Sequence, residues 1–208
     1  MKMHNLLATL ALVACAPAAR GQDSSMVTSQ GDLPRPGLGT LGQDDIAITL
    51  RQEEIEIRIV PMDERLLRLL VADAYTSLHG ILQGHAEEID SVSRRNGVTV
   101  PGLLFVTFFG RRAGARFDPQ NLNLVIRNQL YRPIGIVPYS ANFSAQQVDV
   151  RQQASGIFLF EELIPVFEPF TVSYGATSSD AWESRLNTLQ RERSRVMSRA
   201  RADSVVSQ

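Results

Sequence analysis

The sequence predicts an α+β protein whose main part is an antiparallel β-sandwich of about seven or eight strands, immunoglobulin-like in its general architecture. Short runs rich in Val, Ile and Phe recur along the chain between Pro, Gly and Asn residues, which is typical of strands joined by turns. One segment, 63–95, instead repeats its apolar residues every three or four positions, as a helix does. The last segment, 176–208, also repeats them at helical spacing and is rich in arginine.

Two alternating runs open the predicted β-sandwich domain, which spans residues 45–175. Apolar side chains stand at even positions in Ile46–Leu50 and at odd positions in Ile55–Ile59. Because neighbouring side chains of a strand point to opposite faces, this change of parity predicts a turn or a bulge near residues 52–54. Pro61 is expected to end the second strand.

One long amphipathic helix is predicted for residues 63–95, inserted between the early and the later strands. Its apolar stripe is expected to pack on a sheet, because burying each large apolar side chain contributes about 1.5–3 kcal/mol. Asp63 is expected to cap the start of the helix, and the Asn-Gly pair at 96–97 to end it. Gly80 and Gly84 weaken its middle by about 1 kcal/mol each, which predicts a kink or a close approach to the sheet.

The later strands follow from alternation and composition. Leu103–Phe109 is apolar on both parities, so it is predicted to be a central strand covered on both faces, with the long helix as one cover. Residues 122–126 alternate, which predicts a half-exposed strand followed by a hairpin turn at 128–129. Further strands are predicted within 130–138, at Val148 and Val150, at 156–160 and from Phe170 to Tyr174.

The N-terminus has the pattern of an export signal. One lysine precedes an apolar run over residues 6–14, which is too short to span about 30 Å of hydrocarbon. The chain's one cysteine ends this run, and Leu12–Cys15 (Leu-Val-Ala-Cys) resembles the lipobox of bacterial lipoproteins. The resemblance implies a signal peptide over residues 1–14 and an acylated Cys15 that anchors the protein in the cell envelope, facing the periplasm. Small residues at 16–21 also suit ordinary signal peptidase, so a freely secreted or periplasmic protein is the alternative.

A glycine-rich stretch, Gly37–Gly42 (GLGTLG), matches the spacing of dinucleotide-binding loops. Such a loop needs a strand before it and a helix directly after it. The residues before this stretch are polar and contain proline, and those after it are expected to form a strand, so a nucleotide loop is not predicted. Residues 15–44 are instead predicted to be a flexible tether whose glycines keep it from ordering.

Residues 176–208 are predicted to form a basic C-terminal helix, with a partly disordered tail as the alternative. Between Arg185 and Arg201 this segment has six arginines against one glutamate. Such a helix is expected to lie on an anionic surface, to pack as a coiled coil, or to bind an acidic protein partner. The candidate interaction face consists of Trp182, Leu186, Leu189, Arg185 and Arg193. It would line a partner groove only if its apolar residues are exposed.

Catalytic residues, metal ligands and cofactors are not predicted. His79 and His85 lie six positions apart, which on a helix directs them about 240° apart, so they do not share a metal ion. Glu161 and Glu162 are neighbours at a strand end and therefore face opposite sides. The sequence contains no G-x-S-x-G nucleophile motif, and one cysteine cannot build a thiolate metal site. The formal net charge of −1 gives no reason to expect nucleic acid as a partner.

The sequence therefore predicts a non-catalytic, exported envelope protein, lipid-anchored, with a binding or structural role. Its expected partners are membrane lipid, through the acylated N-terminus, and a protein or an anionic surface for the C-terminal helix. The alternative is an exported enzyme whose active-site residues lie far apart in the sequence and form no motif.

Overall fold

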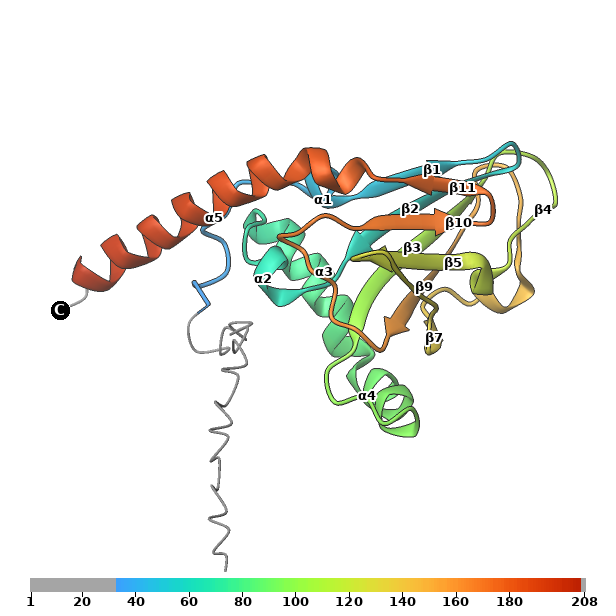
Figure 1. Ribbon diagram of the computed structural model, residues 1–208, viewed down its shortest axis with the longest axis horizontal. Coiled ribbons are helices and arrows are strands. Elements are labelled where there is room, and N and C mark those ends of the chain that lie inside the picture. The colour runs from blue at the N-terminus through green and yellow to red at the C-terminus, as the bar shows by residue number, and fades with distance from the viewer. Residues whose placement is uncertain (1–32, 207–208) are drawn as a thin grey trace, which may run out of the picture.

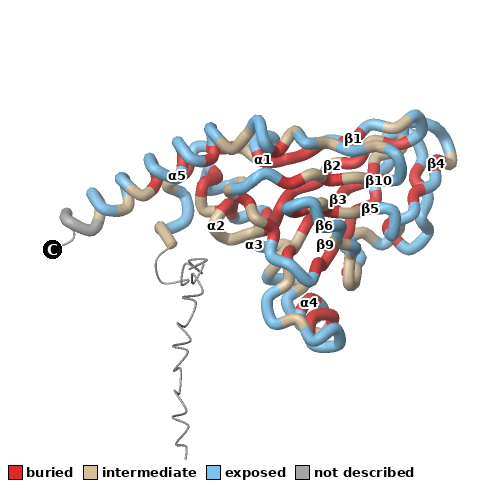
Figure 2. The backbone as a smooth tube through the Cα atoms, viewed as in Figure 1, coloured by how far each residue is buried: buried red, intermediate tan, exposed pale blue. Residues whose placement is uncertain are grey.

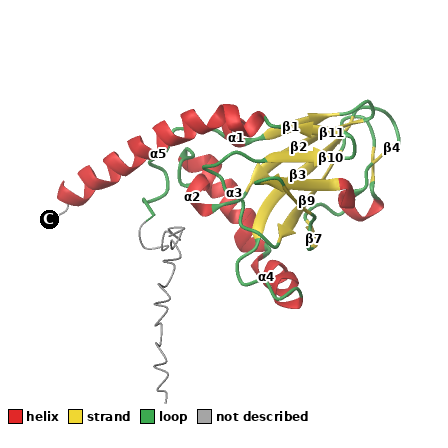
Figure 3. Cartoon of the chain, viewed as in Figure 1, coloured by secondary structure: helices red, strands yellow, loops and turns green. Residues whose placement is uncertain are grey.

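The structure is a computed structural model that describes residues 33–206, so the predicted signal peptide and Cys15 lie outside the described residues. The fold is α+β. The strands lie together at one end of the molecule, and α2, α3 and most of α5 lie at the other end (Figures 1 and 3). The helices are α1 (Gln43–Ile46), α2 (Glu64–Leu67), α3 (Ala72–Gly84), α4 (Ala86–Arg95) and α5 (Ala181–Val206). The strands are β1 (Ile48–Arg51), β2 (Ile55–Pro61), β3 (Gly102–Gly110), β4 (Ala115–Arg116), β5 (Leu122–Ile126), β6 (Gln129–Tyr131), β7 (Gly135–Pro138), β8 (Gln147–Val148), β9 (Gln153–Phe160), β10 (Thr171–Tyr174) and β11 (Thr177–Ser179).

The strands form three antiparallel sheets. The largest has the order β1-β2-β3-β9-β7, the second has the order β11-β10-β5-β6, and β4 pairs with β8. The two larger sheets bury their inner faces in one apolar core, to which β3 contributes Phe108, β5 Leu124 and β10 Val172. Figure 2 shows this buried layer along the strands. The predicted α+β class is confirmed, with eleven strands in the described part of the chain instead of about seven or eight.

The first predicted strand begins later than expected. Residues 43–46 form α1, because Gly42 N–H bonds the Asp45 carboxylate at 2.7 Å and fixes a helical turn there. The turn predicted near 52–54 is confirmed: Gln52 N–H donates to the carbonyl of Ile55 at 2.9 Å and joins β1 to β2.

The prediction of one helix over 63–95 is wrong, because the segment forms the three helices α2, α3 and α4. The predicted ends are confirmed: Asp63 accepts a bond from the Arg65 N–H at 2.8 Å, and Gly97 has φ +68° after α4. The break before α4 falls at His85, whose φ of −121° is not helical, directly after the weak helix former Gly84. Of the two predicted alternatives, the kink is therefore confirmed at Gly84. A close approach is found at neither glycine, because an added Cβ at Gly80 or Gly84 would meet nothing within 4 Å.

The helices still cover the sheet face that their apolar period predicts. Ile89 and Val92 of α4 join Val137, Ile157 and Leu159 of the five-stranded sheet in a second buried cluster. Leu103 and Phe105 pack against this cluster from β3, whereas Phe108 faces the main core. The prediction of a central strand covered on both faces is therefore confirmed.

The β5–β6 turn differs from the sequence prediction. The β5–β6 hairpin turns at Arg127 and Asn128, one position earlier than expected, with φ of 51° and 64°. These positive values are typical of a two-residue type I′ turn, which asparagine tolerates well.

A further strand, β11, pairs with β10, so the sheet continues past the predicted domain boundary at residue 175.

The last part of the predicted tether, 15–44, is folded. Leu41 is buried, its N–H donates to the carbonyl of Leu69 at 3.2 Å, and its own carbonyl accepts from Val71 N–H at 2.9 Å. Gly39 is required by close approach, because an added Cβ would lie 2.0 Å from the oxygen of Leu69. We call residues 34–45 the N-terminal strap. Gly39 therefore allows the strap to dock on the segment that contains Leu69, and does not serve to keep it flexible.

Tyr174 allows a prediction of pH dependence. Its hydroxyl accepts a hydrogen bond from the backbone N–H of Asp118 at 2.8 Å, and burial raises the pKa of Tyr174. Because the folded-state pKa lies above the unfolded value of about 10, this group's contribution is complete below pH 10. It is lost as the pH rises through the folded-state pKa. We expect Tyr174→Phe to lower stability by about 1 kcal/mol at pH 7 and to make the alkaline decline shallower.

Urea unfolding between pH 7 and 11 measures both effects, with Tyr131→Phe on the edge strand β6 as the matched control. An unchanged alkaline slope in Tyr174→Phe would contradict the assignment.

Candidate functional site

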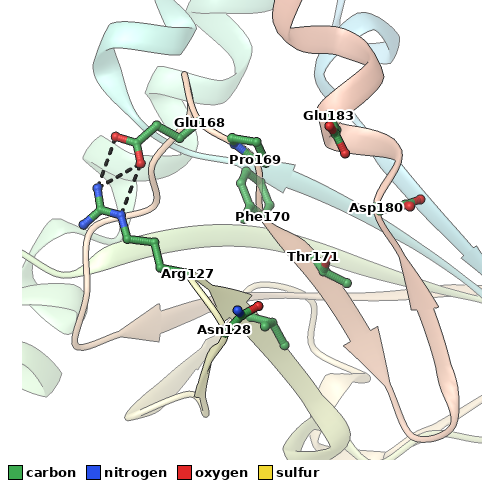
Figure 4. A pocket seen from close by; sticks show the side chains of 9 residues that line it. Arg127, Asn128, Glu168, Pro169, Phe170, Thr171, Asp180 and Glu183 are labelled. Carbon is green, nitrogen blue, oxygen red and sulfur yellow. Dashed lines mark hydrogen bonds and ion pairs between the residues drawn. The ribbon is translucent and has the colours of Figure 1, made fainter.

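An open pocket of about 330 Å³ lies where β5, β10 and the start of α5 meet (Figure 4). Three carboxylates and one guanidinium give its lining most of its polarity. The lining residues are Val125, Arg127, Asn128, Glu168, Pro169, Phe170, Thr171, Asp180 and Glu183. None of them is a histidine, a cysteine or a serine, so this lining offers hydrogen-bond acceptors and charge rather than a side-chain nucleophile of those types.

An ion pair stands at one end of the pocket. Arg127 Nη2 lies 2.8 Å from Oε2 of Glu168 and 3.2 Å from Oε1, so the guanidinium contacts both carboxylate oxygens. The Arg127 and Glu168 side chains are 72% and 52% exposed, so the pair stabilises the fold by at most about 1 kcal/mol. The hairpin turn positions Arg127, because the left-handed backbone there directs its side chain towards the loop before β10.

Two further carboxylates belong to the junction of β11 and α5. Glu183 lies in the first turn of α5, and Asp180 immediately precedes the helix. The N–H of Glu183 donates to the carbonyl of Asp180 at 3.0 Å. Carboxylates at a helix N-terminus stabilise it through the helix dipole, so both groups have a role in local structure. Sequence reasoning missed this pocket because its residues come from three distant segments.

The predicted C-terminal helix is confirmed as α5, but its apolar residues are not a free interaction face. Trp182 is fully buried, its ring lies 5.0 Å from that of Phe170, and its Nε1–H donates to the carbonyl of Val166 at 3.2 Å. Leu189 is 1% exposed, and Leu186 is partly buried against the same core. The condition for a partner groove is therefore not met, because the stripe covers the protein's own core.

The two arginines of the predicted face also contact their own chain. Arg185 Nη1 donates to the backbone carbonyls of Asp44, at 2.9 Å, and Asp45. Burial lowers the pKa of Arg185, which nearby Asp45 partly offsets. Arg193 lies over the ring of Phe167, 4.7 Å from its centre, while its side chain stays on the surface.

A buried carboxylate joins α5 to the N-terminal strap. Glu192, 2% exposed, accepts bonds from the N–H and the hydroxyl of Thr40 at 2.8 and 2.9 Å and pairs with Arg195. Arg199 donates to the carbonyl of Leu38 at 2.6 Å, one turn further on. The sequence signal for this contact was that Glu192 is the one acid in the arginine-rich run. Its partner Thr40 lies 152 positions away.

The two histidines contact different residues. His79 stacks on Tyr75 with ring centres 5.0 Å apart, and its Nδ1 lies 3.4 Å from Glu64. His85 lies against the edge of Tyr139, with ring centres 5.6 Å apart. Within residues 33–206, no three side chains of the His, Cys, Asp and Glu types are grouped so that they could hold a metal ion.

No helix among residues 33–206 has both the length and the apolar composition needed to cross a bilayer. Comparisons of the chain with protein-family models, with curated proteins and with solved structures find no match.

Proposed function

We propose that the protein is an exported envelope protein, held on a membrane by acylated Cys15, with a binding or structural role rather than a catalytic one. The observation that carries the proposal is the tetrapeptide Leu12–Cys15, which places the chain's one cysteine directly after the apolar run 6–14. An apolar run of that length suits an export signal and is too short for a permanent membrane helix.

The position at which the fold begins supports an anchored arrangement. The strap docks from residue 34 onwards, so residues 16–33 connect the cysteine to the folded part. Even fully extended, a connection of this length reaches about 60 Å, at 3.3–3.6 Å per residue. An anchored Cys15 would therefore keep the body close to the membrane surface.

The pocket supports a binding or structural role. Arg127 is paired with Glu168, and Asp180 and Glu183 stand at the start of α5, where carboxylates stabilise the helix dipole. Its volume of about 330 Å³ is at the lower end of the range for small-molecule sites. The acidic lining fits a cationic or N–H-bearing group better than an anion.

We also propose that the two larger sheets are the layers of a β-sandwich that is immunoglobulin-like in general architecture. Support comes from the antiparallel pairing and from the core that their inner faces share. β1, β2 and β3 are neighbours in chain order, with α2, α3 and α4 inserted between β2 and β3, so any likeness concerns the layers and not the strand connections.

Replacing Cys15 by serine tests the anchor. We expect the parent protein to remain with the membranes in 0.5 M salt, at about a 4 Å Debye length, and to be released by detergent. Cys15→Ser is expected to move to the soluble fraction under the same salt conditions, because no acyl chain can be attached. Ala19→Ser, which keeps the cysteine, is the matched control and should stay with the membranes.

Mass spectrometry of the mature N-terminus gives the second measurement. An acylated cysteine as the first residue is expected. An unmodified N-terminus within residues 16–22 would contradict the anchor and establish ordinary signal-peptidase cleavage.

A further inference from the structure

We propose that the pocket beside the start of α5 binds an extended peptide segment of a partner protein. One cationic side chain of that segment, an arginine or a lysine, enters the pocket, and an apolar side chain four residues away packs on the neighbouring sheet surface. The proposal rests on the binding role in the proposed function and gives that role a ligand. It does not depend on the lipid anchor.

The pocket has a surplus of negative charge that its own residues do not neutralise. Its lining has three carboxylates and one guanidinium, and that guanidinium, Arg127, already contacts both oxygens of Glu168. The carboxylates of Asp180 and Glu183 have no hydrogen bond or ion pair with another residue in 33–206. Figure 4 shows the Arg127–Glu168 pair on one side of the pocket and Asp180 and Glu183 on the other. A cation that enters there therefore meets two carboxylates without a partner.

The start of α5 does not offer the pocket an anion site. A helix N-terminus carries about half a positive charge and free N–H groups, and these ordinarily attract anions. Here the N–H of Ala181 donates to the Ser179 hydroxyl at 3.2 Å, and the N–H of Glu183 donates to the carbonyl of Asp180 at 3.0 Å. Asp180 and Glu183 also bring two negative charges to the same place. A cation is therefore the complementary ligand.

The surface beside the pocket favours a peptide over a small cation. Val125 pairs with Thr171 on one side and with Leu130 on the other, so the three side chains lie in one row across the sheet. Val125 and Thr171 line the pocket, and Leu130, on the edge strand β6, is 54% exposed. The volume of about 330 Å³ suits the end of one long side chain. A small cation would leave the apolar end of the row in water, whereas a peptide would cover it.

The length of the row sets the spacing within the peptide. Ser179 pairs with Val172, so Asp180 stands opposite Thr171 and continues the row at its other end. From Asp180 to Leu130 the row crosses three strand spacings, which is about 14 Å. In an extended peptide, residues four apart point to the same side and lie about 13 Å apart. A cationic and an apolar residue separated by three others therefore match the two ends of the row.

The test uses a chain that begins at Ala16, which keeps every described residue and has no cysteine to acylate. The probes are two acetylated and amidated pentapeptides, Arg-Ser-Gly-Ser-Leu and its reverse, because the row does not fix the direction of the peptide. Two-dimensional NMR at low salt measures the affinity and locates the binding, and the amides of Val125 and Thr171 are expected to shift. Replacing the arginine of the peptide by glutamine is expected to weaken binding about 10-fold.

The pocket variant carries D180N and E183Q, which keep the shape of both side chains and remove their charge. It is expected to bind the arginine peptides about 10-fold more weakly than the parent does. The control carries D73N and E87Q, two exposed acids in the first turns of α3 and α4, with the same change of charge. It is expected to bind as the parent does. Circular dichroism verifies that both variants are folded.

Leu130→Ala tests the apolar end of the row. It is expected to lower the affinity for the pentapeptides about 5-fold and to leave the affinity for a single acetylated and amidated arginine unchanged. Val100→Ala, at another exposed apolar position, is the control and should have no effect on either probe.

Several results would overturn the proposal. Equal losses in the pocket variant and its control would mean that net charge alone explains binding, and equal affinity for the arginine and glutamine peptides would exclude recognition of a cation. Binding of the single capped arginine as tightly as the pentapeptides would make the pocket a small-cation site. Shifts confined to amides outside the pocket would place the peptide elsewhere. Each of these leaves the membrane attachment of the parent protein unchanged, so failure here is distinct from failure of the Cys15 test.

Discussion

Trp182→Ala is expected to destabilise the protein by about 3–5 kcal/mol, the largest effect of any change considered. The indole is fully buried, packs on Phe170, and donates to the carbonyl of Val166 at 3.2 Å. Alanine would leave a cavity between α5 and the sheets and would leave that carbonyl without its partner. Denaturant unfolding followed by far-ultraviolet circular dichroism measures the loss.

The matched control is Gln190→Ala, an exposed position of the same helix, which is expected to stay within about 0.5 kcal/mol of the parent. Trp182 is the chain's one tryptophan, so its fluorescence reports on the docking of α5. Fluorescence and circular dichroism should follow one transition if α5 and the sheets unfold together. A fluorescence change well before the main transition would mean that α5 docks as a separate unit.

Gly39→Ala is expected to cost about 1–3 kcal/mol and to loosen the N-terminal strap. The added methyl would lie 2.0 Å from the oxygen of Leu69, and a backbone atom cannot move aside as the end of a side chain can. The strap would lift, and Leu41 would lose the backbone bonds that it exchanges with Leu69 and Val71. Hydrogen exchange at the amides of Leu41 and Val71 measures this loosening directly.

Gly42→Ala is the comparison for this prediction. An added Cβ at residue 42 would lie 3.7 Å from the nearest atom, the Asp45 carboxylate oxygen, which is ordinary contact. Amide protection in Gly42→Ala should therefore resemble that of the parent. Equal protection in both variants would refute the close approach at Gly39. It would restore the interpretation of GLGTLG as a plain spacer.

Local periodicity predicted the elements whose pattern is contained within a few residues. The strands β2, β3 and β5, the capping role of Asp63 and the terminal helix all follow from spacing and from the chemistry of single residues. The sequence also predicted that β3 is covered on both faces, because its residues are apolar at both even and odd positions. These features are local, so the sequence alone is sufficient for them.

The breaks between α2, α3 and α4 could not be predicted from local periodicity. The apolar period of 63–95 continues across both breaks, since the short helices α2, α3 and α4 all turn apolar residues towards the protein. The apolar period therefore predicts that one side of the segment is buried. It does not predict that the segment is one continuous helix.

The sequence by itself determined the α+β class, most of the strands and the export-signal pattern. Only the tertiary structure decided that α5 belongs to the core, that Glu192 holds Thr40, and that the glycines of the strap allow docking. The physical reason is the same in each case. An apolar stripe indicates that something packs on it, and a glycine permits a close approach. The surface that packs there comes from a distant segment, 152 residues away for Glu192 and Thr40, and no local pattern encodes that pairing.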